Sequence, residues 1–551
     1  MSLHPQNIPD VPKQTAKIAK AAFRRGNDYI IMRDKLGEFY QDLDFAHLFA
    51  VRGRPGETPW RLALILVFQF AEGLSDEQAA QAVRSRIDWK YALSLELDDS
   101  GFDASVLSEF RSRLVAGNAE TKLLDIMLER FKEAGHIKVR GRQRTDSTHV
   151  LAAVRNLNRL VLVGETMRHA LNVLAVSAPE WLKPQIEPEW IDCYERRFDE
   201  YRLPKEVPQR EALAEQIGAD GRQLLRAIFA PASPGWLREV EAVRILHRVW
   251  LQQYEAVADN EPMRWRQVTD QPPSSVRIHT PYDPEARYSA KRDTTWLGYK
   301  VHLTESCDED APYLITHVFT TPATTPDFDA PAIIQADLAA KELLPAEQLF
   351  DAGYVDGGLL VDSLQQHQVN VIGPVAPDHC WQALTEGAYD VSHFAIDWEA
   401  KRVTCPQGHT SQKWSHTHNH LGSPIINIRF APKACSQCAE RAKCTRSQSG
   451  PRHMTFHPQP EHEALQQRRI FQKTAEFKQQ YDPRAGIEGT ISQAVRGTDL
   501  RRSRYIGLAK THLQHILCAA AINLYRVVNY MADLPISHTR TSSFAALATA
   551  T

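Results

Sequence analysis

Three acidic residues in widely separated segments constrain the fold of this chain more than any other feature. Asp146 ends a basic extended run, RQRTD, and Asp351 directly follows the short apolar run QLF. Glu488 lies in a predicted helix beside Arg484. Carboxylate oxygens suit Mg²⁺, and two ions about 4 Å apart can stabilise both the attacking and the leaving oxygen of an in-line displacement. A fold that joins the three segments would form a divalent-metal phosphoryl-transfer site, with a nucleic-acid phosphodiester as the implied substrate.

Motifs around these residues set them apart from the other carboxylates among the 67 Asp and Glu of the chain, most of which are expected at the surface. The stretch from Tyr481 to Glu488, YDPRAGIE, has the pattern Tyr-x2-Arg-x3-Glu. Three further blocks are DTTWLGYKVHL, LITHVFTTPATTPD and LFDAGYVDGG. Over most of its length, from about residue 50 to about residue 530, the sequence resembles bacterial insertion-sequence transposases of the DDE type.

The resemblance implies a transposase that binds the ends of a mobile DNA element, cuts the phosphodiester backbone and joins the ends to target DNA. It implies that Asp146, Asp351 and Glu488 hold two Mg²⁺ or Mn²⁺ ions. It also implies that Tyr481 and Arg484 clamp a phosphate or a flipped base near the cut. The implied partners are the terminal inverted repeats, target DNA and a second copy of the chain, as a homodimer on DNA.

Charge patterning places the expected DNA contacts locally. The net charge of −2 gives no global case for DNA binding, so a DNA surface has to come from clusters. One segment of the sequence has five arginines and only two acidic residues, Glu488 and Asp499. The arginines are Arg484, Arg496, Arg501, Arg502 and Arg504. The family pattern expects a Lys seven residues after Glu488, where this chain has Val495 followed by Arg496. A side chain one position along a helix points about 100° around the axis, so Arg496 replaces that Lys only in part.

Composition is that of a soluble globular protein, with 43% hydrophobic and 24% charged residues. The longest apolar run, Leu62 to Phe70, is too short to span a bilayer, and the N-terminus lacks the apolar core of a secretion signal. We therefore expect no membrane partner and a cytoplasmic protein, associated with the nucleoid when bound to DNA.

The N-terminal region, residues 1–135, is predicted to be a helical domain. It begins with a basic arm over residues 1–40, and helices are expected to open at Pro59 and at the capping box Ser75-x-x-Gln78. Short helices joined by tight turns fit helix-turn-helix DNA recognition and fit a plain helical bundle equally well. The family resemblance favours recognition of the element ends.

The predicted fold class is α/β, a ribonuclease-H-like core with large insertions. Two β-rich runs separated by an acidic loop predict a hairpin, and the α/β units after it complete the succession expected of that core. The core is assigned to residues 136–150, 271–373 and 481–535, with a helical insertion over 151–270 and a disordered tail over 536–551. In such a core the first and fourth strands are neighbours, which would bring Asp146 beside Asp351.

A second insertion, residues 374–480, contains the clustered cysteines. Cys435-x2-Cys438 has the spacing of a zinc knuckle, and Cys405 and Cys444 supply two more thiols. Four thiolates close a tetrahedral structural site, so we expect a zinc-ribbon-like module with one Zn²⁺, in which His409 could replace one ligand. Free cysteines filling a small core are the alternative.

Lys300 is a further predicted DNA contact. Lys300 lies in a predicted strand and is expected to meet phosphate near the metal site, or to be a solvated edge-strand residue.

Two other functions remain as alternatives. A structure-selective nuclease of the same fold would need the same three carboxylates. A DNA-binding protein derived from such an element, with a decayed site, would not need them.

Overall fold

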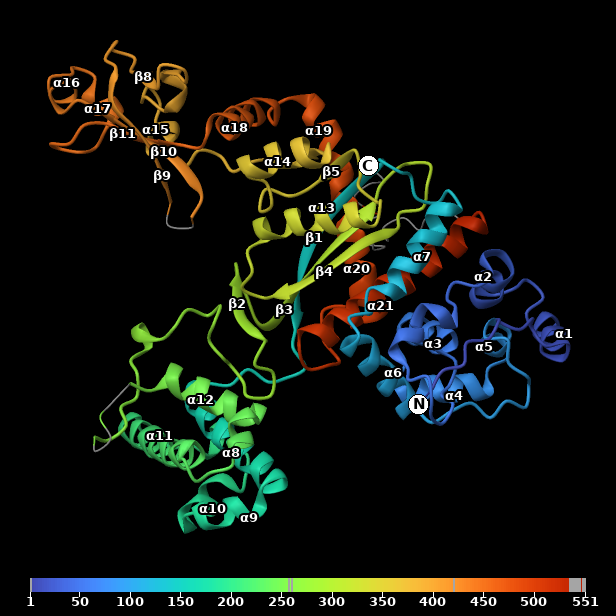
Figure 1. The fold of residues 1–551 in the computed structure, drawn as a ribbon. Helices are drawn as coiled ribbons and strands as arrows, with labels where there is room; N and C mark the ends of the chain where they lie inside the picture. The colour runs from blue at the N-terminus through green and yellow to red at the C-terminus, as the bar shows by residue number, and fades with distance from the viewer. Residues whose placement is uncertain (1, 256–257, 259–260, 420–421, 535–546, 548–551) are drawn as a thin grey trace.

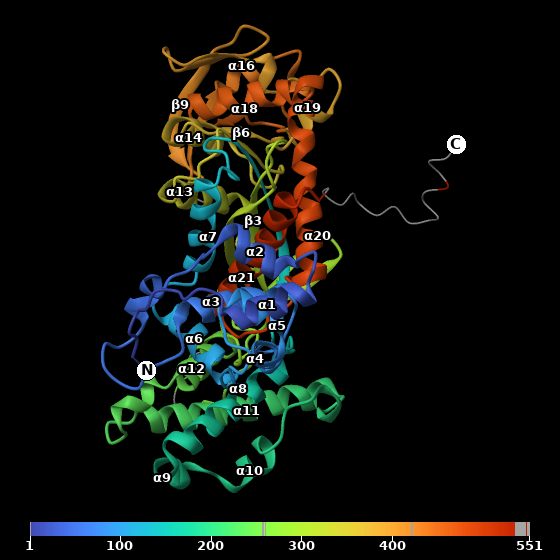
Figure 2. The same ribbon diagram turned by 90° about the vertical axis from the view of Figure 1, so that its right-hand side faces the viewer.

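A computed structural model describes residues 2–255, 258, 261–419, 422–534 and 547. They form a central α/β unit, a group of helices from the N-terminal region that packs against it, and two outlying modules (Figures 1 and 2). The predicted tail, residues 536–551, lies outside the described residues except for residue 547. Among the described residues, none forms a helix with the length and apolarity needed to cross a bilayer.

The central sheet has six strands, which run through three separate parts of the sequence. Their bounds are β1 (Arg142–Leu151), β2 (Arg287–Lys291), β3 (Thr294–Ser306), β4 (Ile315–Pro322), β5 (Glu347–Leu349) and β6 (Asn370–Ile372). Strand β3 is antiparallel to β1, β2 and β4, whereas β5 is parallel to both β1 and β6. The order across the main path is β2-β3-β1-β5-β6, with β4 also paired to β3. Strand β1 therefore lies at the middle of the sheet, between β3 and β5.

Helices cover both faces of this sheet (Figure 1). Those that follow the strands are α13 (Ala330–Ala340), α14 (Gly357–His367), α18 (Gln459–Phe471), α19 (Ala475–Tyr481), the short 3-10 helix η8 (Asp482–Ala485), α20 (Gly486–Thr498) and α21 (Leu508–Met531). Because strand side chains alternate, Gln143 of β1 reaches Leu343 after α13, whereas Arg144 reaches Pro483 of η8 on the other face. The second face is the one that α20 shares with β1.

The N-terminal helices pack onto the central unit around one continuous hydrophobic core. They are α1 (Lys13–Ala22), α2 (Asp28–Leu36), η1 (Asp42–Leu48), α3 (Pro59–Ala71), α4 (Asp76–Ser85), α5 (Ile87–Ala92), α6 (Ser105–Ala116) and α7 (Lys122–Glu133). The predicted starts are confirmed, since Pro59 is the first residue of α3 and Ser75 forms a capping box with Gln78. Helix α3 is apolar on nearly every side and is buried against α21.

The first insertion is a helical module with a hydrophobic core of its own, at the opposite end of the molecule from the cysteine-containing module (Figure 1). Its helices are α8 (Arg159–Ser177), α9 (Pro179–Leu182), η2 (Lys183–Gln185), α10 (Pro188–Tyr194), η3 (Glu200–Arg202), α11 (Val207–Phe229), η4 (Gly235–Glu239), α12 (Glu241–Gln253) and η5 (Val268–Asp270). Glycines on α11 allow close packing, since a Cβ at Gly221 would lie 2.1 Å from the Trp250 ring.

The second outlying module is a small β structure, also with its own core. It contains α15 (Trp381–Leu384), η7 (Val391–His393), β7 (Ala395–Asp397), β8 (Arg402–Thr404), β9 (Ser411–His418), β10 (Pro424–Phe430), α16 (Pro432–Ser436), α17 (Arg441–Cys444) and β11 (His453–Phe456). Strand β10 lies between β9 and β11, and β7 pairs with β8. The range predicted as insertion, 374–480, extends further than this module, because α18 packs against α14 and Phe477 of α19 packs against Leu349 and Ile372 of the central sheet.

Candidate active site

Asp146 lies in the middle of β1, on the face that α20 covers. Its Oδ1 accepts a hydrogen bond of 2.7 Å from the backbone N–H of Ser147, and its side chain is 14% exposed. Thr145 and Val150 of the same strand are completely buried. Asp146 is therefore a largely buried carboxylate held on a rigid, central strand.

Asp351 comes two residues after the end of β5, the parallel neighbour of β1. The completely buried Phe350 anchors this chain reversal, and Asp351 Oδ1 accepts a hydrogen bond of 2.8 Å from the backbone N–H of Gly353. Arg144 pairs with Leu349 in the parallel β1–β5 ladder, so Asp351, two residues later, lies level with Asp146.

Arg484 joins all three predicted carboxylates. Its Nη2 lies 2.5 Å from Asp146 Oδ2 and 3.9 Å from Asp351 Oδ2, and its Nη1 lies 3.0 Å from Glu488 Oε1. Glu488 is one helical turn after Arg484, in the first turn of α20. The structure thus brings Asp146, Asp351 and Glu488 together around one guanidinium, which lies where the three carboxylates approach one another.

Within this carboxylate cluster (Asp146, Asp351 and Glu488), burial and neighbouring charges shift the pKa of Asp146. Burial raises the pKa of Asp146, Arg484 lowers it, and the nearby charge of Asp351 raises it again, with a net increase. Burial alone would lower the pKa of Arg484, but the charges of Asp146 and its neighbours outweigh burial and raise it. The arginine stays charged, and the ionisation of Asp146 is disfavoured.

Tyr481 borders the cluster. Its ring stacks on Phe477, with ring centroids 5.4 Å apart and an interplanar angle of 16°. Burial raises the pKa of the Tyr481 hydroxyl, Arg484 lowers it, and the charges of Asp351 and Asp146 raise it again, with a net increase. The phenol is therefore a protonated hydrogen-bond donor at neutral pH.

Lys300 lies on β3 at the flank of the cluster and is already engaged by protein groups. Its Nζ donates to Asp327 Oδ1 at 2.8 Å and to the Thr325 carbonyl at 2.7 Å. Burial opposes the ionisation of Asp327, but the bond from Lys300 outweighs it, and the pKa of Asp327 is lowered. Asp327 also accepts from Ser147 Oγ at 3.3 Å, so Lys300 reaches β1 through Asp327.

The other predicted DNA-binding arginines have different locations and orientations in the structure. Arg496 is exposed in the last turn of α20, and Val495 beside it packs against the core. Arg501 donates from Nε to Thr148 Oγ1 at 2.8 Å, and Thr148 is two residues after Asp146 on the same face of β1. Arg502 is exposed and follows the end of β1, where its neighbour Ser503 bonds to Leu151. Arg501, and not Arg502, is therefore oriented toward the carboxylate face.

The four predicted zinc-binding cysteines line one small cavity in the β module. Cys405, Cys435, Cys438 and Cys444 surround it together with His409, and all four are free thiols. Burial raises the pKa of Cys444, Arg452 lowers it, and the other three thiols raise it again. The other three thiols are thus near enough to Cys444 to affect its ionisation. In the part of the chain that the structure describes, no group of three or more His, Cys, Asp or Glu side chains is clustered closely enough to hold a metal ion.

Sequence reasoning missed two residues beside the cluster. Arg144 is two positions before Asp146 on β1, and period-2 alternation alone could have placed it on the same face. Tyr354 is completely buried after Asp351, and its hydroxyl lies 2.7 Å from His302 Nδ1. Nothing local in the sequence identifies that pair, because 52 residues separate its members.

Two protein-family models match the chain. One, described as a transposase DDE domain, covers residues 404–528, which include the segment from Tyr481 to Glu488. The other, described as a transposase domain (DUF772), covers residues 19–113, which include α2 to α5. No curated protein and no solved structure gave a significant match to the chain.

Proposed function

We propose that this chain, which its two family matches identify as an insertion-sequence transposase of the DDE type, uses Asp146, Asp351 and Glu488 to cut and join DNA. The observation that carries the proposal is the meeting of these three carboxylates at Arg484. They come from a central strand, the end of a neighbouring strand and a distant helix. Three carboxylates with one shared arginine are hard to explain as a device for stability, because burial already raises the pKa of Asp146.

A ribonuclease-H-like core is the fold we propose for the catalytic part. Its support is the strand order, in which β4, β3 and β1 are antiparallel neighbours and β5 and β6 continue the sheet in parallel. The pairing of β1 with β5 supports this assignment, because Asp146 is on β1 and Asp351 follows the end of β5.

The carboxylate cluster fits a divalent cation in its chemistry. Its donors are oxygens, which suit Mg²⁺ or Mn²⁺, and its three carboxylates outnumber the one guanidinium. Asp146, Asp351 and Glu488 would hold the ions. Such ions, two per site, would activate the attacking oxygen and stabilise the leaving oxygen.

The chain's own side chains would position the DNA. Arg484 lies where the three carboxylates meet, and its guanidinium would bind a phosphate oxygen of the DNA. The protonated Tyr481 hydroxyl can donate to the same phosphate. Arg501 binds Thr148, two residues after Asp146 on β1, and would contact the adjoining DNA backbone.

We also propose the remaining partners and the structural metal. Arg496 and Arg502 are exposed and would neutralise phosphates of the terminal inverted repeats or the target DNA, within a homodimer on DNA.

The structural metal would be one Zn²⁺, held by Cys405, Cys435, Cys438 and Cys444. The support for this site is that all four cysteines line one cavity.

The test is a cleavage and joining assay with Mg²⁺ on DNA that carries the inverted repeats flanking the gene. We expect the wild type to cut the ends and join them to a second DNA, and Asp146→Asn, Asp351→Asn and Glu488→Gln to abolish both steps. Asp362→Asn, an exposed carboxylate of α14, is the matched control and should stay active. Cutting without joining would indicate the nuclease function, and end binding without cutting would indicate a DNA-binding protein with a decayed site.

A further inference from the structure

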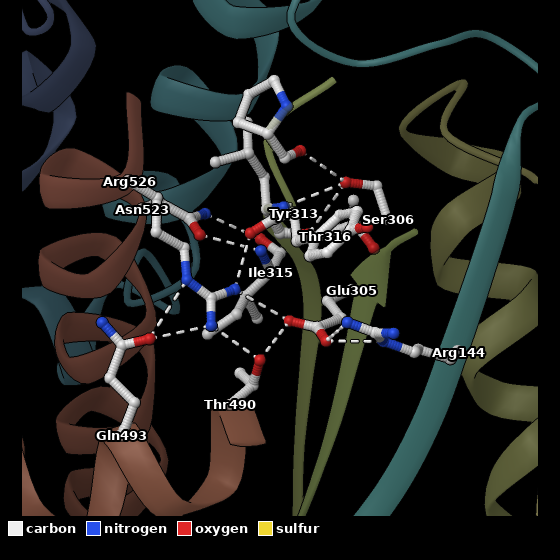
Figure 3. Close-up of polar contacts among 12 residues, drawn as sticks. Arg144, Glu305, Ser306, Tyr313, Ile315, Thr316, Thr490, Gln493, Asn523 and Arg526 are labelled. Carbon is white, nitrogen blue, oxygen red and sulfur yellow. Dashed lines mark hydrogen bonds and ion pairs between the residues drawn. The ribbon is translucent and has the colours of Figure 1, made fainter. Parts of the chain in front are cut away.

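A buried charged network joins the central sheet to the helices on the face that contains Asp146 (Figure 3). Its centre is Glu305 of β3, which is 0% exposed. Glu305 Oε1 accepts from Arg144 Nε at 2.7 Å, and Oε2 accepts from Thr490 Oγ1 at 2.5 Å and from Arg526 Nη1 at 2.8 Å. Figure 3 shows these side chains converging from β1, β3, α20 and α21. One carboxylate thus connects the central strand to both helices of the face that contains the cluster.

The network is tied to the position of Asp146 by strand register. Arg144 and Glu305 are direct cross-strand partners in the β1–β3 ladder. Arg144 is two residues before Asp146, so both side chains project from the same face of β1. Any group that Arg144 holds is therefore held at a fixed distance from Asp146.

Arg144 holds the turn that leads into the Glu488 helix. Its Nη1 donates to the carbonyl of Pro483 at 2.6 Å, one residue before Arg484. Glu305 binds the same segment from the other side, through Thr490, two residues after Glu488. The two contacts bracket the segment that supplies Arg484 and Glu488 to the cluster.

A glycine at the start of α20 allows this approach. A Cβ at Gly486 would lie 2.0 Å from Arg144 Nη1, so a side chain there would displace the guanidinium. Gly497, near the other end of the same helix, has no atom within 4 Å of the corresponding position. The close approach of Arg144 thus accounts for the glycine between Arg484 and Glu488.

We propose that Arg144 and Glu305 are positioning residues, which set where Arg484 and Glu488 lie relative to Asp146. The side chain of Glu488 is 66% exposed, and among the described residues its one ion-pair partner is Arg484, so its place depends on the backbone of α20. A buried network whose members are all bonded has one favourable arrangement, because each broken bond leaves a polar group unpaired at low dielectric. The inference rests on the proposed function of the cluster.

The experiment measures single-turnover cleavage of end DNA by the full-length protein, at saturating DNA and below the unfolding temperature. Glu305→Gln should lower the cleavage rate about 10- to 100-fold, the range found when partners that orient metal ligands are removed. DNA affinity should be unchanged, and the Mg²⁺ concentration for half-maximal rate should rise. A network that serves only stability would lower the unfolding temperature and leave the rate and the Mg²⁺ dependence unchanged.

Glu165→Gln is the matched control. Glu165 is also a buried glutamate in an ion pair, with Arg168, but lies in the separate core of the helical insertion. We expect this variant to lose stability and keep its cleavage rate. Equal rates for Glu305→Gln and Glu165→Gln would overturn the proposal.

Gly486→Ala tests the same contact without removing a buried charge. It should slow cleavage, whereas Gly497→Ala should not. In the Arg144→Gln background the effect of Gly486→Ala should largely disappear, because the guanidinium it displaces is gone. Additive effects in this double-mutant cycle, or wild-type cleavage by Gly486→Ala, would refute the positioning role. If Asp146→Asn itself cuts like the wild type, the proposed function fails first, which separates the two failures.

Discussion

Arg484 lies 2.5 Å from the carboxylate of Asp146, although 338 residues separate them in the chain. The arginine comes from the 3-10 helix η8 just before α20, and the aspartate from the central strand β1. A charge-assisted hydrogen bond of this kind is among the stronger polar contacts in proteins. Asp351 approaches the same guanidinium, and its negative charge disfavours the ionisation of Asp146, which makes Asp146 sensitive to pH and to cations.

Asp146→Asn should make the metal-free protein more stable at pH 7 and abolish cleavage. The folded pKa of Asp146 is raised above the unfolded value of 3.8, so its ionisation opposes folding as pH rises above 3.8. The stability gain of the variant should therefore be largest at neutral pH and vanish below that unfolded value. Thermal unfolding across pH measures the gain, and cleavage should fall about 100-fold or more.

Mg²⁺ supplies the control for that variant. It should raise the unfolding temperature of the wild type and have a smaller effect on Asp146→Asn, because the ion offsets a repulsion that the variant lacks. Asp362→Asn should behave as the wild type in both measurements. A variant that is less stable than the wild type at pH 7 would contradict the raised pKa.

Arg484→Ala should lower the cleavage rate of DNA-saturated protein far more than it lowers affinity for end DNA. The reason is its location between the carboxylates, where its guanidinium would bind the phosphate being cut. Arg496→Ala, an exposed arginine of the neighbouring helix, is the control and should affect affinity alone. Lost affinity with a preserved rate for Arg484→Ala would remove Arg484 from the active site.

Arg501→Ala and Arg502→Ala should differ in their effects on cleavage, although the two residues are adjacent in the sequence. Arg502→Ala should weaken binding to all DNA sequences alike and make the salt dependence shallower by about one unit of slope. Arg501→Ala should in addition slow cleavage, because Arg501 binds the same strand face as Asp146. Paired measurements of rate and salt-dependent affinity test this, and identical behaviour of the two variants would contradict it.

Zinc removal should unfold the β module alone. With Cys405, Cys435, Cys438 and Cys444 as ligands, a chelator should reduce amide-exchange protection within the module and leave the central sheet protected, since the module has its own core. Cys435→Ser should reproduce the effect, whereas Cys380→Ser, an exposed cysteine outside the cavity, should not. Protein that contains no zinc and whose four thiols react freely would disprove the site.

Acid should destabilise the protein through its buried histidines. Burial, helped by His512, lowers the pKa of His515 on α21 to about 3, so between the unfolded value of 6.5 and that value the unfolded state binds the extra proton. Stability should fall as pH drops through this window, and His515→Gln should reduce the slope by up to about 1.4 kcal/mol per pH unit. The exposed His379→Gln is the control, and denaturant unfolding between pH 7 and 4 is the measurement.

Local patterns were sufficient for several strands of the central sheet. The β-rich runs on either side of the acidic loop became β3 and β4, and the apolar run before Asp351 became β5. These signals are short-range, because alternation and turn residues act over a few positions. The three acidic segments were found through motifs, and the structure brings them to one arginine.

Long-range pairing was beyond sequence reasoning. The β1–β3 register decides that Arg144 meets Glu305, and 161 residues separate them. Strand β2 and the return of α18 to the central unit were missed as well, because their signals are weak until a partner is present. The separation of Arg501 from Arg502 has the same origin, since it depends on which residue meets Thr148.

The helical module between β1 and β2 also has a consequence for the order of folding. Strand β1 can pair with β3 only after the ends of a long intervening segment meet, and the entropic cost of closing such a loop grows with its length. Because this segment buries its own hydrophobic core, it can collapse first and deliver its two ends close together. The central ladder would then close over a short effective span, so the helical module would act as an internal folding nucleus for the central sheet.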